Sequence, residues 1–155
     1  MILAGSKSDL EWIAPMEKML REFGVKYEIR IASAHKTPRR VLEILEEYEK
    51  KGESLVYITV AGRSNALSGF VDANTVYPVI ACPPYSEKFG GVDVFSSLRM
   101  PSGVAPLVIL DPEGAALAAV KMLALEDRSL IKKISGYHAR MAEKLEKDDR
   151  ELEGR

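Results

Sequence analysis

Cysteine, metal-binding patterns and the common cofactor motifs are scarce or absent in this sequence. Cys82 is the single cysteine of 155 residues, so no internal disulfide can form, and an unpaired thiol indicates a reducing compartment. It lies in the apolar run PVIACPP, where a small buried hydrophobe is a better interpretation than a catalytic thiol. The chain has no cysteine pair, no HExxH, no G-x-x-x-x-G-K-[ST] and no G-x-G-x-x-G. We therefore expect neither a bound metal ion nor a cofactor.

Charge of one sign and long hydrophobic runs are also lacking. Lys and Arg number 22 against 23 Asp and Glu, a balance that argues against a nucleic-acid partner. No apolar run approaches the roughly 18 residues of a membrane helix, and we find no charged leader followed by an apolar stretch. We expect a cytoplasmic protein with no membrane partner. A length of 155 residues with 46% hydrophobic residues fits one domain over residues 1–155.

Short apolar runs alternate with longer helical patterns, which predicts an α/β fold with helices on both faces of a parallel sheet. We expect a three-layer, doubly wound, flavodoxin-like sheet of about five strands. Alternation of Tyr27, Ile29 and Ile31 with charged residues predicts a strand near an edge, and the nearly continuous apolar run at 54–62 predicts a central strand. The other strands are expected at the start of the chain, at 77–84 and at 105–110.

Helical spacing predicts a first helix that ends at Gly24 and contains Pro15, either in the first turn of a late-starting helix or at a kink. Thr37 is the expected N-cap of a second helix and Pro38 its first residue. An alanine-rich helix at 112–125 closes the core, which spans about residues 1–125. A long C-terminal helix at about 129–152 carries one apolar stripe, formed by Leu130, Ile134, Tyr137, Met141 and Leu145.

The candidate functional residues follow the strand ends, because ligands of doubly wound sheets bind beyond the carboxyl ends of the strands. GSKSD, residues 5–9, offers a glycine, two hydroxyls and a helix start, which suit a phosphate, while Asp9 would suit ribose hydroxyls. The alternative is that Ser8 or Asp9 only caps the following helix.

His35 lies between a strand and a helix, followed by Lys36 and the cap-and-proline pair. An imidazole held there can carry a proton to or from a substrate, although a lone histidine is more often structural or simply exposed. His138, among charged residues of the last helix, is expected to be solvated. AGRSN, residues 61–65, could let a ligand approach backbone amides or could simply begin a helix. Arg63 and Arg99 are candidate clamps for phosphate or carboxylate.

Five motifs in this order, GSKSD, SAHKTP, AGRSN, YPVIACPP and SSLRMPSG, resemble the phosphoribosylaminoimidazole carboxylase family of purine biosynthesis. The resemblance covers roughly residues 1–125. It implies an octameric enzyme that needs no cofactor, with His35 as the catalytic residue and the last helix at a subunit interface. The substrate-binding residues that it implies are Ser6, Ser8, Asp9, Ser33, Lys36, Gly62, Arg63, Ser64, Asn65 and Arg99.

The family has two branches, and the motifs are more similar to the branch that uses carbon dioxide directly, as in the carboxylase domain of the bifunctional animal enzyme. Lys36 replaces the arginine of the mutase branch, and Ala66 falls where that branch has a second histidine. The resemblance implies carboxylation of 5-aminoimidazole ribonucleotide at C4. The alternatives are an N5-carboxyaminoimidazole ribonucleotide mutase and a non-catalytic flavodoxin-like binding domain. A phospho-accepting receiver is disfavoured, because Asp9 alone follows the first strand.

Overall fold

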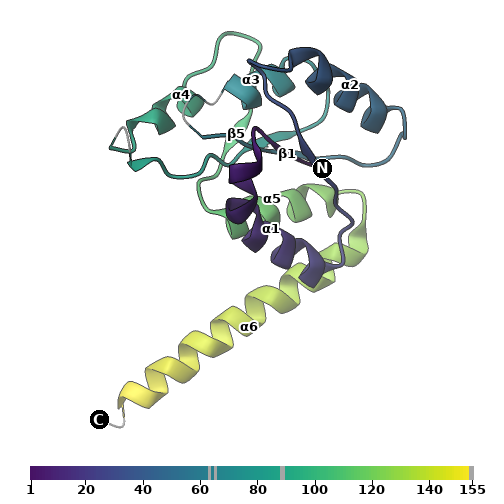
Figure 1. Ribbon diagram of the computed structural model, residues 1–155. Helices are drawn as coiled ribbons and strands as arrows, with labels where there is room; N and C mark the ends of the chain where they lie inside the picture. The colour runs from purple at the N-terminus through teal and green to yellow at the C-terminus, as the bar shows by residue number, and fades with distance from the viewer. Residues whose placement is uncertain (63, 65, 88–89, 154–155) are drawn as a thin grey trace.

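Five parallel strands form one sheet in the described part of the chain, which in this computed structural model is residues 1–62, 64, 66–87 and 90–153. Their order is β2-β1-β3-β4-β5, the order of flavodoxin-like sheets, and the expected doubly wound, flavodoxin-like fold is confirmed (Figure 1). The strands are β1 (Ile2–Ala4), β2 (Ile29–Ile31), β3 (Tyr57–Val60), β4 (Val79–Ala81) and β5 (Leu107–Val108).

The strand positions follow from their sequence patterns. β2, with its alternating polar residues, is an edge strand, and Ile31 remains half exposed there. β3, with its continuous apolar run, lies in the centre and is buried throughout. Both predictions are confirmed. Register pairs Ile2 of β1 with Ile29 of β2 and with Ile58 of β3.

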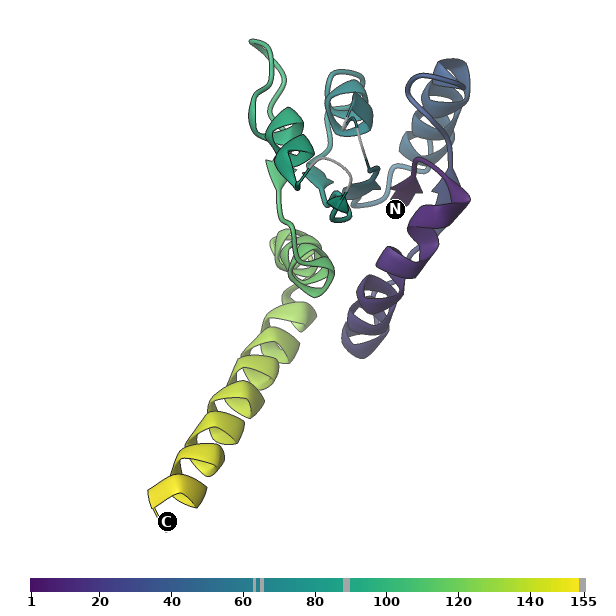
Figure 2. The same ribbon diagram turned by 60° about the vertical axis from the view of Figure 1, so that its left-hand side comes forward.

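Helices cover both faces of the sheet, since successive strand side chains point to opposite faces. On one face, Ile2 and Ile58 pack in a core with α1 (Leu10–Phe23) and α5 (Pro112–Leu123). On the other, Leu3 and Tyr57 pack with α2 (Pro38–Glu49) and α3 (Ala66–Asp72). The three layers are visible in Figures 1 and 2. The described residues also include the short helical segments η1 (Lys7–Asp9), η3 (Val92–Val94) and α4 (Phe95–Leu98).

Pro15 lies inside α1, as its sixth residue. Of the two alternatives that the sequence left open, the late start with Pro15 in the first turn is therefore wrong. As the sixth residue Pro15 lies beyond the first turn, so α1 lacks the hydrogen bond that an N–H at this position would donate to the Glu11 carbonyl. At the other end, Gly24 adopts φ +69° and its N–H donates to the Arg21 carbonyl at 3.0 Å, which confirms the predicted stop.

The last helix, α6 (Arg128–Glu153), leaves the body of the molecule at an angle (Figures 1 and 2). Its first turns are anchored on α1: Lys133 Nζ donates to the Phe23 carbonyl at 2.6 Å, and the rings of Phe23 and Tyr137 lie 5.6 Å apart. Farther along, Met141 and Leu145 are exposed, the latter by 69%. The apolar stripe thus continues beyond the part that the body covers. No helix among the described residues is long and apolar enough to span a membrane.

Candidate active site

A cavity of about 490 Å³ opens at the carboxyl ends of the three neighbouring strands β1, β2 and β3. Parallel strands present these ends at one edge of the sheet, so three loops far apart in sequence meet there. The cavity is lined by Gly5, Ser6, Ser8, Asp9, Ser33, Ala34, His35, Lys36, Ala61, Gly62, Ser64 and Leu67. It therefore brings together most of the residues that the sequence analysis singled out.

The floor of this cavity is a close approach between the ends of β1 and β3. The Gly5 N–H donates to the Val60 carbonyl at 2.8 Å. A Cβ atom on Gly5 would lie 3.2 Å from Ala61 Cβ and 3.6 Å from Asp9 Oδ2. Glycine at position 5 and alanine at position 61 thus allow the loops after β1 and β3 to lie side by side.

The loop after β1 holds a hydrogen-bonded cluster of two hydroxyls and one carboxylate. Ser6 Oγ donates to Asp9 Oδ2 at 2.9 Å, and the Oγ atoms of Ser6 and Ser8 lie 2.7 Å apart. Asp9 is buried, with 8% of its surface exposed. It occupies the N-cap position of α1, but its side chain makes no capping hydrogen bond. Helix capping therefore does not account for this carboxylate.

The loop after β2 carries His35 and Lys36 on a tight turn. Thr37 is the N-cap of α2 and Pro38 its first residue, as predicted, but the Thr37 side chain does not cap the helix. Instead, Thr37 Oγ1 accepts from the Ser33 N–H at 2.9 Å. Within the described residues, the His35 imidazole is exposed and makes no hydrogen bond. Its position therefore depends on the backbone of the turn.

The loop after β3 contributes Gly62 and Ser64, while Arg63 and Asn65 lie outside the described residues. α3 begins at Ala66, the residue that follows AGRSN in the sequence, which agrees with the helix-start interpretation of that motif. Sequence reasoning missed Leu67, a buried residue of α3 that lines the cavity. The only signal was its place two residues after the polar motif.

Arg99 is not brought to this cavity. It follows α4 and is exposed, and it is absent from the described lining of the cavity. His138 lies on α6, exposed, with its ring 6.0 Å from that of Tyr137. Its expected solvation is confirmed.

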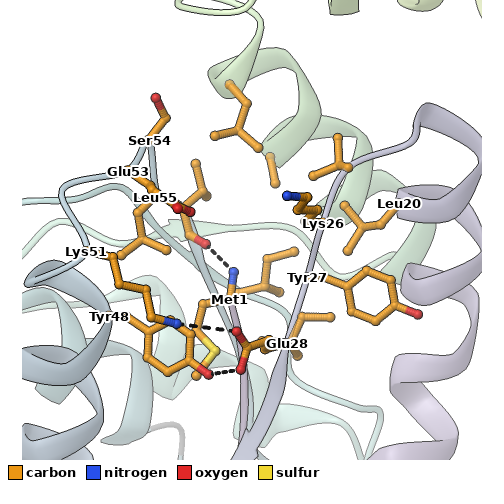
Figure 3. A pocket seen from close by; sticks show the side chains of 16 residues that line it. Met1, Leu20, Lys26, Tyr27, Glu28, Tyr48, Lys51, Glu53, Ser54 and Leu55 are labelled. Atoms are coloured by element: carbon orange, nitrogen blue, oxygen red, sulfur yellow. Dashed lines mark hydrogen bonds and ion pairs between the residues drawn. The ribbon is translucent and has the colours of Figure 1, made fainter.

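Figure 3 shows a second cavity, of about 160 Å³, at the amino ends of the strands. Glu28, which lines it, is already paired: the Tyr48 hydroxyl donates to Glu28, and Lys51 Nζ lies 3.4 Å from Glu28 Oε1. The Tyr48 hydrogen bond, followed by that of Lys51, lowers the pKa of Glu28. None of the described residues around it is a histidine. The cavity at the carboxyl ends is therefore the better candidate for chemistry.

Cys82 is fully buried just after β4, and its Sγ lies 3.7 Å from the Leu110 carbonyl. Burial raises the pKa of its thiol to about 11, since a thiolate would lose its hydration. At neutral pH the group is thus protonated and a poor nucleophile.

We expect Cys82 to resist a thiol reagent such as DTNB in the native protein at pH 8 and to react fully once the chain is unfolded in guanidinium chloride. The rate is followed by absorbance of the released thiolate. Rapid reaction of the native protein at pH 8 would contradict a buried, protonated thiol. The unfolded sample serves as the control for reagent activity.

Chemically, the cavity at the carboxyl ends combines groups suited to different parts of a ligand. Hydroxyls and a buried carboxylate can bind sugar hydroxyls, Lys36 supplies a positive charge, and His35 supplies an imidazole that can move a proton. Within the described residues, no group of three or more His, Cys, Asp or Glu side chains is placed to hold a metal ion.

Comparison with known proteins agrees with this arrangement. The profile of the AIR carboxylase family matches residues 1–144. The chain is 56% identical over 151 residues to a phosphoribosylaminoimidazole carboxylase of Archaeoglobus fulgidus. That alignment covers 97% of this chain and 83% of the relative. It is 45% identical over 126 residues to the bifunctional phosphoribosylaminoimidazole carboxylase/phosphoribosylaminoimidazole succinocarboxamide synthetase of Mus musculus, covering 81% of this chain and 30% of the relative.

Among solved structures, the crystal structure of Treponema denticola PurE superimposes with a TM-score of 0.95 at 46% sequence identity. The alignment covers 97% of this chain and 96% of that chain. The similarity therefore extends over the whole fold, the long last helix included.

Proposed function

Because this chain belongs to the AIR carboxylase family, we propose that it carboxylates 5-aminoimidazole ribonucleotide at C4 with carbon dioxide, giving 4-carboxy-5-aminoimidazole ribonucleotide in purine biosynthesis. One observation carries the proposal: His35 lines the same cavity as Ser6 and Asp9. A proton-carrying ring thus lies beside a cluster suited to a sugar phosphate. We place the reaction in the cytoplasm, in keeping with the unpaired Cys82.

The chemistry needs little beyond positioning. The aminoimidazole ring is electron-rich and enamine-like, so that C4 can attack carbon dioxide directly and form a new C–C bond. The tetrahedral carbon then loses its proton to His35, which restores the aromatic ring, and the reverse reaction returns that proton. In this scheme the imidazole is the only protein group that must change its protonation state.

The other lining residues bind the substrate in this proposal. Asp9 accepts hydrogen bonds from the ribose hydroxyls, because its carboxylate is buried and held by Ser6. Lys36 attracts the phosphate as a point charge, without the bidentate geometry of arginine. Ser8, Ser33, Gly62 and Ser64 line the space for phosphate or carbon dioxide. For Arg63, Asn65 and Arg99 substrate contact rests on the family resemblance alone.

Two features favour direct carboxylation over the mutase reaction. Lys36 and Ala66 stand where the mutase branch carries an arginine and a second histidine.

The test is to supply purified protein with aminoimidazole ribonucleotide plus bicarbonate and, separately, with the N5-carboxylated isomer. We expect turnover of the first mixture, followed by absorbance of the carboxylated product. Rapid turnover of the isomer alone would contradict direct carboxylation and identify a mutase. No turnover of either substrate would favour a binding domain.

We also propose that the chain assembles as a homo-octamer in which α6 lies at a subunit interface. Met141, Leu145 and Leu152 are exposed along the far half of this helix, and such a stripe is stabilised when a second copy covers it. Light scattering coupled to size-exclusion chromatography should give the mass of eight chains. A monomeric mass at micromolar concentration would contradict the proposal.

A further inference from the structure

The five-residue turn from Ser33 to Thr37 is closed by hydrogen bonds at both of its ends. The Ser33 N–H donates to Thr37 Oγ1 at 2.9 Å, and the Thr37 N–H donates to the Ser33 carbonyl at 2.9 Å. The Thr37 hydroxyl also donates to the Ser33 carbonyl at 3.4 Å. The Lys36 N–H donates to Ser33 Oγ at 3.3 Å. The first and last residues of the turn are thus tied together around His35.

The Thr37 hydroxyl is used differently from that of an ordinary N-cap. An N-cap side chain usually accepts from a backbone N–H in the first turn of its helix. Thr37 makes no such bond, although its backbone carbonyl accepts from the Val41 N–H at 3.2 Å and so begins α2. The hydroxyl instead joins α2 to the end of β2, where the Ala32 N–H donates to the Ala4 carbonyl at 3.0 Å.

This connection matters because, among the described residues, the His35 side chain itself has no hydrogen-bond partner, so the bonds of the turn are what orient it. The side chain is exposed at the wall of the cavity. A reacting side chain that only its backbone holds can be positioned no more precisely than that backbone. Small displacements of a catalytic group cost much of the rate.

We propose that Thr37 is a positioning residue, whose hydroxyl closes the Ser33–Thr37 turn and thereby holds His35 against C4 of the substrate. The inference rests on the proposed function. It adds a residue outside the lining of the cavity whose effect on the rate passes through His35.

The test compares Thr37→Val, which removes the hydroxyl at nearly constant shape, with Thr37→Ser, which keeps it. We expect kcat to fall about tenfold in Thr37→Val and to stay within about threefold of wild type in Thr37→Ser. Thr75→Val is the matched control. Thr75 precedes β4, at the other end of the sheet, and its hydroxyl donates to Glu49 Oε1 at 2.6 Å; the substitution removes this hydroxyl. It should leave kcat unchanged even if it lowers the melting temperature.

The decisive measurement is Thr37→Val in a His35→Asn background, since two residues that act as one unit are not additive. We expect the valine to cost less than about twofold there. Equal losses in both backgrounds, or full activity of Thr37→Val with His35 present, would overturn the inference. Failure of the proposed function has a different signature: the wild-type protein itself would turn over neither substrate.

Discussion

Replacing His35 by asparagine will lower turnover at least ~100-fold and leave the melting temperature nearly unchanged. Asparagine is polar and similar in size, but it cannot accept and return a proton near neutral pH. The stability of the fold should be unaffected, because the imidazole is exposed and makes no hydrogen bond within the described residues. The rate should depend on it, because in the proposed reaction this ring is the group that removes the C4 proton.

The measurement is kcat with aminoimidazole ribonucleotide and bicarbonate, together with thermal unfolding of the same preparation. His138→Asn is the matched control, since it makes the same chemical change on the exposed surface of α6. Survival of turnover in His35→Asn would mean that another group moves the proton. Loss of folding would mean that His35 has a structural role.

Replacing Asp9 by asparagine will lower kcat/KM by about 10- to 100-fold, mainly through a higher KM. The side chain keeps its shape and can still accept from Ser6, but it loses the charge that strengthens hydrogen bonds to ribose hydroxyls. A hydrogen bond to a charged group contributes about 1.5–3 kcal/mol, and each 1.4 kcal/mol is a factor of ten.

Glu11→Gln is the control for Asp9→Asn. It removes one negative charge from the first turn of the same helix, at a residue that does not line the cavity. Initial rates over a range of ribonucleotide concentrations separate KM from kcat. If KM stays at the wild-type value in Asp9→Asn, the carboxylate serves the loop and not the substrate.

The sequence patterns predicted the layers of the fold better than the composition of the site. The alternation around Ile29 identified the edge strand and the apolar run around Ile58 the central strand. Burial on one face produces alternation of polar and apolar residues, and burial on both faces produces a continuous apolar run. The sequence left the start of α1 open, because a proline near a helix start suits both the first turn and a position slightly later.

For the candidate site, the strand-end rule was enough to group the loops after β1, β2 and β3, because these three strands are neighbours. Arg99 precedes β5, on the far edge of the sheet, and motifs alone do not place such loops laterally. The role of the Thr37 hydroxyl was equally hidden, since the same residue types cap helices and close turns. Only coordinates distinguish the two.

The contact of Gly5 with Ala61 limits how this cavity could be redesigned. A Cβ atom added to Gly5 would lie 3.2 Å from the Ala61 methyl, so the two strand ends would have to yield by a few tenths of an ångström to admit it. Attempts to admit a larger or differently shaped ring should therefore leave the base alone and vary Ala34 or Leu67 on the walls. Substitutions meant to change the selectivity of the cavity therefore belong at Ala34 and Leu67 before Gly5.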